Sequence, residues 1–139
     1  MSILSADEVQ AKLDASPFIA FSGLRVVSAD AEKGEITMRA PFRPEFERAA
    51  GSGQWHGGPI AAVIDTVGDF ALGMLLGGGI PTVNFRVDYL RPAIRTDLVA
   101  TARVRRNGRS FGIADVDVFD EQGRLLAIGR ATYVTAPAG

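Results

Sequence analysis

The chain has 139 residues, with 15 lysines and arginines against 16 aspartates and glutamates, no cysteine and one histidine. Its length suits a single domain with its own hydrophobic core, and its net charge of −1 gives no electrostatic sign of a nucleic-acid partner or an anionic membrane surface. The lack of cysteine excludes disulfides and cysteine nucleophiles, and a single histidine excludes a metal site built from several histidines. We therefore expect one domain over residues 1–139 that uses no metal or other cofactor.

Residues 1–22 are expected to form an N-terminal helical segment. Ser5 and Glu8 have the spacing of a capping box, which predicts a short helix that runs to about Leu13. Residues 18–21 are mostly apolar and are interpreted as a turn packed on the core. The segment carries several charged residues and lacks the apolar stretch of a secretory signal peptide, so we expect a cytoplasmic protein.

Alternation of apolar and polar residues predicts two strands in the first third of the chain and four in the second half. The expected strands cover residues 24–29, 35–40, 82–90, 98–106, 111–119 and 125–134. Glycine-containing turns join the first two strands and the last three, which implies antiparallel pairing. Residues 41–54 contain two prolines and two glycines and form a connection long enough to suggest a functional or mobile loop.

A long helix is predicted from about residue 57 to residue 76, and glycines 77–79 should end it. Its expected core-facing residues recur with helical spacing: Ile60, Val63, Ile64, Val67, Phe70, Ala71, Met74 and Leu75. The opposite side carries small and apolar residues around Asp65, Thr66 and Asp69, which favours a face on which another element packs.

One helix can cover only one face of an antiparallel sheet, so the economical arrangement is a sheet wrapped round the helix. The predicted fold class is therefore α+β, with about six antiparallel strands around one long central helix. Two aspartates near the middle of this helix would each cost roughly 2.5 to 3.5 kcal/mol in a bilayer, so we expect no membrane span.

The turn His56-Gly57-Gly58 leads directly into the helix and is the first candidate for chemistry. The amides of Gly57 and Gly58 would point at a ligand oxygen, with the positive end of the helix behind them. A plain glycine turn with an exposed histidine is the alternative. Asp65 is the second candidate, because a carboxylate among apolar neighbours is costly to bury unless it is paired or kept for chemistry. Asp69 is assigned mainly a solvent or pairing role.

These residues resemble the signature of a known family. His56-Gly57-Gly58, with Asp65 nine residues after the histidine, resembles the motif of hotdog-fold thioesterases of the PaaI-like, phenylacetate-pathway type. The sequence Tyr89-Leu90-Arg91-Pro92-Ala93 is similar to the family strand that ends in the same five residue types. The resemblance covers residues 24–134 and implies active sites at the interface of a homodimer or a homotetramer (dimer of dimers), with sheets joined edge to edge.

The resemblance also implies roles for individual residues. The amide of Gly57 would polarise the thioester carbonyl, and Asp65 of the other subunit would activate water or attack directly. Thr82 would help to orient the water, and His56 would hold the turn in place. The implied reaction is hydrolysis of an acyl-CoA thioester to the free acid and CoA.

Substrate binding is less well defined by the sequence. Ala50 stands where relatives often carry an asparagine that helps to fix the thioester, and Gln54 is the candidate substitute. The predicted turn between residues 106 and 111 offers positive charge and backbone amides for the CoA phosphates, with a solvated hairpin as the alternative. Its candidate residues are Arg105, Arg106, Asn107, Gly108 and Arg109. Arg91 and Arg95 form a second basic candidate.

Two other functions remain open at this point. A non-catalytic hotdog module that binds acyl groups or CoA is one, and Ala50 is the argument for it. A hotdog dehydratase acting on hydroxyacyl thioesters is the other, and it would need His56 as a base. Trp55, Phe70 and residues 18–21 are candidates to line an acyl pocket, and core packing is the alternative for each.

Overall fold

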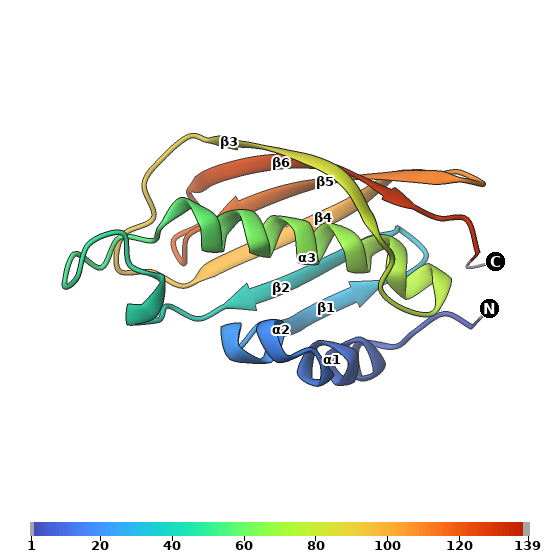
Figure 1. Cartoon of the computed structure of the whole chain (residues 1–139), viewed down its shortest axis with the longest axis horizontal. Helices are drawn as coiled ribbons and strands as arrows, with labels where there is room; N and C mark the ends of the chain where they lie inside the picture. The colour runs from blue at the N-terminus through green and yellow to red at the C-terminus, as the bar shows by residue number, and fades with distance from the viewer. Residues whose placement is uncertain (1, 138–139) are drawn as a thin grey trace.

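The computed structural model describes residues 2–137 of the chain. Figure 1 shows one long helix lying across a curved sheet, with two short helices near the N-terminus. The elements in chain order are α1 (Ala6–Ala15), α2 (Pro17–Ser22), β1 (Arg25–Asp30), β2 (Glu35–Ala40), η1 (Pro44–Phe46), α3 (Gly57–Leu76), β3 (Thr82–Tyr89), β4 (Leu98–Asn107), β5 (Phe111–Phe119) and β6 (Leu125–Val134). The expected α+β fold, six antiparallel strands around one central helix, is confirmed.

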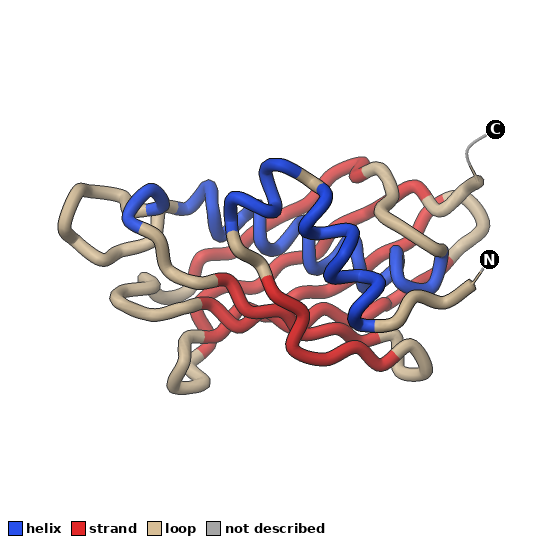
Figure 2. Tube along the Cα trace, turned by 90° about the horizontal axis from the view of Figure 1, so that it is seen from below, coloured by secondary structure: helices blue, strands red, loops and turns tan. Residues whose placement is uncertain are grey.

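The six strands form one antiparallel sheet in the order β1-β2-β4-β5-β6-β3. The strands predicted at 35–40, 111–119 and 125–134 have the expected bounds, and each of the others differs by one residue at one or both ends. Figure 2 shows the helices gathered on one side of the strand layer. Strand β3 lies at one edge of this sheet, so one of its sides is left unpaired by the rest of residues 2–137.

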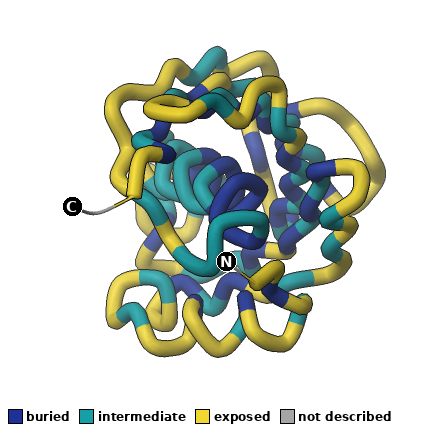
Figure 3. The backbone as a smooth tube through the Cα atoms, turned by 90° about the vertical axis from the view of Figure 1, so that its right-hand side faces the viewer, coloured by how far each residue is buried: buried dark blue, intermediate teal, exposed yellow. Residues whose placement is uncertain are grey.

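Helix α3 is the core of the domain. The residues predicted to face the core are buried, except for Leu75, which is partly exposed. Figure 3 looks along the domain and shows α3 running through its middle, surrounded by strands and loops. Gly77 ends the helix with a left-handed φ of 91°, as predicted. By length and composition α3 passes as a membrane span, but it is packed against the sheet in the manner of a core helix.

The prediction that another element packs on the opposite side of α3 is confirmed for part of that side. Gly68, Leu72 and Gly73 are buried there by other parts of the same chain. A Cβ atom on Gly68 would lie 2.5 Å from the hydroxyl oxygen of Tyr133, so this close approach requires glycine. The part of this side that stays partly exposed is centred on Asp65.

The N-terminal segment contains two helices rather than a helix and a turn. Helix α1 has the predicted capping box, in which the Glu8 amide donates to Ser5 Oγ at 3.1 Å and the Ser5 amide donates to Glu8 at 3.0 Å. Residues 17–22 form α2 instead of the expected turn. Pro17 suits the first position of a helix, and Gly23 ends it with a φ of 71°.

Candidate active site

The turn before α3 presents an available backbone amide. His56 caps the helix, because its Nδ1 accepts a hydrogen bond from the Gly58 amide at 3.4 Å and its own amide donates to the Phe46 carbonyl at 2.7 Å. Gly57 is the first residue of α3, and the first amides of a helix have no partner within it. Within residues 2–137 no other group accepts from the Gly57 amide. This amide therefore remains available to a ligand oxygen at the positive end of the helix.

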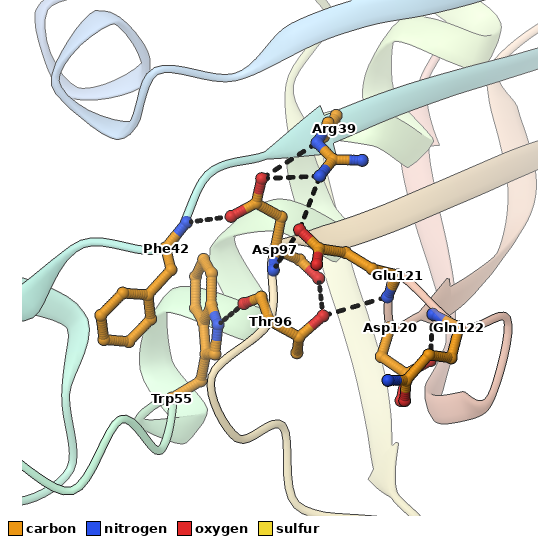
Figure 4. Close-up of polar contacts among 8 residues, drawn as sticks. All are labelled: Arg39, Phe42, Trp55, Thr96, Asp97, Asp120, Glu121 and Gln122. Atoms are coloured by element: carbon orange, nitrogen blue, oxygen red, sulfur yellow. Dashed lines mark hydrogen bonds and ion pairs between the residues drawn. The ribbon is translucent and has the colours of Figure 1, made fainter.

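The loop that carries the turn is held at both of its ends, as Figure 4 shows. At its start, the Phe42 amide donates to the Asp97 carboxylate at 2.8 Å. At its end, the indole N–H of Trp55 donates to the Thr96 carbonyl at 2.8 Å, and Trp55 is only 2% exposed. Thr96 and Asp97 are themselves bonded to the β5–β6 turn. The residue directly before His56 is thus fixed in the core.

A groove of about 380 Å³ opens beside the turn. It is bordered by four predicted site residues, which the structure thus brings together: Gln54, His56, Gly57 and Arg91. Tyr89, which was not predicted, borders it as well. The Tyr89 hydroxyl donates to the Gly57 carbonyl at 2.7 Å and steadies the first turn of α3. Ala50 lies exposed in the preceding loop.

Asp65 lies in the middle of α3, where two hydroxyl groups hold it. The Thr82 hydroxyl donates to Asp65 Oδ1 at 2.8 Å, and the Tyr133 hydroxyl donates to the Asp65 carbonyl at 2.7 Å. The first contact depends on a bulge in β3, because Thr82 pairs with Tyr133 while Asn84 pairs with Thr132. The extra residue turns Thr82 toward the helix, whereas strict alternation would place it on the other face of the sheet.

Asp65 is partly exposed and borders an open cleft of about 510 Å³ between α1, α2, α3 and residues 79–81, which precede β3. The lining combines polar residues such as Lys12 with apolar residues such as Ile80, so the expectation of apolar surroundings for Asp65 holds only in part. Helical geometry is the reason, because nearby apolar residues such as Ile64 point to the core and not to the cleft.

Asp69 lies one helical turn after Asp65 in the same cleft. Burial raises the pKa of Asp69 to about 7; the hydrogen bond from the Ile80 amide at 2.9 Å opposes this rise, and the negative charge of Asp65 adds to it. Of the two roles predicted for Asp69, pairing is the one observed, and its partner is this backbone amide. The cleft therefore holds the Asp69 carboxyl beside Asp65, and Asp69 changes charge near neutral pH.

Replacing Asp69 with Asn should stabilise the protein above pH 7. The pKa of Asp69 is higher in the folded chain than the ordinary value of about 3.9, so the free energy of unfolding falls as the pH rises from about 4 to 7. Asn keeps an acceptor for the Ile80 amide and does not ionise. Thermal unfolding at pH 8 should give a Tm at least about 3 °C above the wild type, a gain that shrinks toward pH 4. Equal Tm values at pH 8 would contradict this.

One chain does not bring Gly57 and Asp65 to the same ligand atom, because they are eight positions apart on α3, a rise of about 12 Å. The β4–β5 hairpin with residues 105–109 lies at the end of the domain opposite Gly57 (Figure 1). The Gly108 amide donates to the Phe111 carbonyl at 3.0 Å, so the expectation of a free amide at this residue is wrong.

Sequence reasoning did not assign a role to Tyr89 or Tyr133, and it did not predict the burial of Asp69. Both tyrosine hydroxyls donate to carbonyls of α3, and a tyrosine in a strand gives no sign of the atom that its hydroxyl will reach. Tyr89 belongs to the quoted strand motif, which was the only available signal. Asp69 was considered, but its burial depends on how the segment after α3 folds back.

Comparison with known proteins identifies the family. The thioesterase superfamily matches residues 52–127, more than half of the chain. The chain is 33% identical over 136 residues to the protein VNG_1336C of Halobacterium salinarum, covering 90% of this chain and 88% of that one. It is 28% identical over 111 residues to the acyl-coenzyme A thioesterase PaaI of Escherichia coli, covering 78% and 74%. A crystal structure of a thioesterase superfamily protein, 33% identical, matches with a TM-score of 0.87 over 93% of this chain and 96% of that one. The chain therefore belongs to the thioesterase superfamily, as a PaaI-like thioesterase with the hotdog fold.

Proposed function

We propose that the protein hydrolyses an acyl-CoA thioester to a carboxylic acid and CoA, at a site shared by two subunits in the cytoplasm. Similarity to an acyl-CoA thioesterase supports the substrate class. The observation that carries the proposal is the combination on one helix of an available Gly57 amide and the Asp65 carboxylate, which accepts from Thr82. A backbone donor and a carboxylate suffice for this reaction, so no metal or other cofactor enters it.

In the proposed reaction the Gly57 amide donates to the thioester carbonyl oxygen and stabilises the negative charge that develops there. Asp65 of the other subunit takes a proton from water as the water attacks the carbonyl carbon, or it attacks that carbon itself and water then cleaves the anhydride. The C–S bond breaks, and the CoA thiolate leaves and takes up the proton that the water has lost. Thr82 orients the carboxylate or the water, and His56 holds the turn.

Strand β3 supports the shared site. Its unpaired edge exposes apolar side chains, with Val83 at 50%, Phe85 at 39% and Tyr89 at 54% exposure, and such an edge favours pairing with another strand. If two β3 edges pair about a two-fold axis, the two α3 helices run in opposite directions. Gly57 of one subunit then approaches Asp65 of the other. We propose a homodimer of this form, alone or as half of a homotetramer.

The mass in solution tests this assembly. Light scattering at micromolar concentration should give at least twice the chain mass of 14.7 kDa, because the site needs residues from two subunits. A Phe85→Glu variant, which places charge on the β3 edge, should shift the mass toward the monomer and lower activity in parallel. A monomer with full thioesterase activity would rule out the shared site.

The groove beside the turn is the proposed place for the CoA end of the substrate. Arg91 borders it and is better placed than the hairpin to meet a phosphate near Gly57. Gln54 borders the same groove. It is the proposed replacement for the asparagine that relatives often carry at the position of Ala50. The hairpin residues are Arg106, Asn107, Gly108 and Arg109. They join the site only where the hairpin of the partner subunit lies next to the turn.

A panel of acyl-CoA thioesters, followed by release of free thiol, tests the function. Hydrolysis liberates CoA thiol. Hydration or dehydration of the acyl group leaves the thioester intact, and a binding module only raises the Tm. Thiol release with at least one acyl-CoA is the expected result, and its absence across the panel alongside ligand-dependent Tm shifts would favour a binding module.

A further inference from the structure

A third cavity, an almost wholly apolar pocket of about 220 Å³, lies between α2, η1 and the first half of α3. Its main walls are Phe18, Ile19, Phe46, Pro59, Ala62 and Thr66. Phe18 stands at the outer side of the pocket and is 60% exposed, whereas Phe46 is buried. Trp55 and Phe70, the other aromatic candidates for an acyl pocket, are buried in the core and do not line it.

The pocket offers very little to a polar ligand. No charged side chain borders it. The hydroxyl of Ser22, one of its few polar groups, already donates to the Ile19 carbonyl at 2.6 Å. A charged or strongly polar group placed here would lose its hydration without gaining a hydrogen-bond partner, so the pocket favours apolar ligand groups.

The pocket adjoins the proposed site at both ends. Gly58 borders it and follows directly on Gly57, whose amide is the proposed carbonyl donor. Ile19 and Thr66 border both this pocket and the cleft that holds Asp65. An acyl chain attached to a carbonyl at Gly57 therefore starts next to the residue that borders this pocket.

We propose that this pocket receives the acyl group of the substrate and selects an uncharged, apolar group of about eight carbon atoms, as a chain or a ring. The assignment rests on the proposed thioesterase function and adds its substrate class. The size follows from volume, because a dry apolar cavity of about 150 Å³ holds one benzene ring and this pocket is about half as large again.

The acyl-CoA series should show this selection directly. For straight chains, kcat/KM should rise by about fourfold per added methylene until the pocket is full, near octanoyl, and then level off or fall. Phenylacetyl-CoA tests whether the pocket accepts an aromatic ring. Adipoyl-CoA, which carries a carboxylate at the end of a six-carbon chain, should be at least about 100-fold poorer than hexanoyl-CoA.

Ala62→Leu is the variant that tests the location. Leucine and alanine have similar helix propensities, and the added carbons enter the pocket from α3. The preferred chain should shorten by about three carbons, and the ratio of octanoyl-CoA turnover to acetyl-CoA turnover should fall by about tenfold or more. Ala20→Leu makes the same substitution at an exposed position of α2 outside the pocket. This variant should have the same dependence of turnover on chain length as the wild type.

Phe18→Ala tests the same pocket in the opposite direction. It removes a wall that is already mostly exposed, so the fold should tolerate it, and the preferred chain should lengthen. Unchanged chain-length profiles in both variants, with thiol release intact, would overturn the pocket assignment and leave the thioesterase proposal standing. No thiol release from any acyl-CoA by the wild type would instead overturn the underlying function.

Discussion

Replacing Asp65 with Asn should lower turnover of the best acyl-CoA substrate by at least about 100-fold, the low end for losing a positioned base. Asn has nearly the same shape and keeps an oxygen that accepts from the Thr82 hydroxyl, so the side chain should stay in place. It neither takes a proton from water nor attacks a carbonyl. Thiol release under saturating substrate measures the loss, and an unchanged Tm shows that the fold is intact.

Asp69→Asn is the matched control for this variant. It makes the same change one helical turn away, on a carboxyl that borders the same cleft. Because Asp69 accepts a hydrogen bond from the Ile80 amide, we expect the Asp69→Asn variant to lose less than tenfold in turnover. Turnover like that of the wild type in Asp65→Asn would refute the role of Asp65, and an equal large loss in both variants would mean that the charge of the whole cleft matters.

The main elements of the fold were predictable because their patterns are long and regular. Helix α3 repeats its core residues over 20 positions, and strands β2 and β5 alternate without interruption. Helix α2 was missed because six residues are too few to show a helical period, and its signals are only Pro17 at the start and Gly23 at the end. Short elements are fixed by packing more than by their own pattern.

The site was predictable in its residue types and not in its contacts. The turn at Gly57 and the carboxylate of Asp65 follow from local sequence, since a helix start and a charge on an apolar helix are both visible there. The contact between Thr82 and Asp65 depends on a bulge in β3, and alternation alone places Thr82 on the wrong face. Gly68 was expected on a face on which another element packs, but its partner there, Tyr133, could not be identified from the sequence pattern.

Replacing Gly57 with Pro should lower turnover by about 100- to 1000-fold, the effect of removing one oxyanion donor. Proline lacks the N–H and is well suited to the first position of a helix, which Gly57 occupies. His56 has φ −70° and ψ 153°, a conformation that the residue before proline readily adopts. The fold should therefore survive the loss of the donor.

Gly57→Ala is the matched control for this variant. Its Cβ atom would lie 3.2 Å from the Tyr89 hydroxyl oxygen, as the proline Cβ would, but it keeps the amide. Tyr89 is exposed and has room to move, so we expect most of the turnover to remain in Gly57→Ala. Equal losses in the two variants would show that the Cβ contact, and not the missing N–H, is responsible.

Co-expression of Gly57→Pro with Asp65→Asn tests whether two subunits share the site. Each mixed dimer then has one site with an intact Gly57 from one chain and an intact Asp65 from the other, and one site that lacks both. Random pairing should restore about a quarter of the wild-type turnover, because half of the dimers are mixed and each has one working site of two. If a single chain supplied both groups, every site in the mixture would lack one of them, and turnover would stay at the low level of the separate variants.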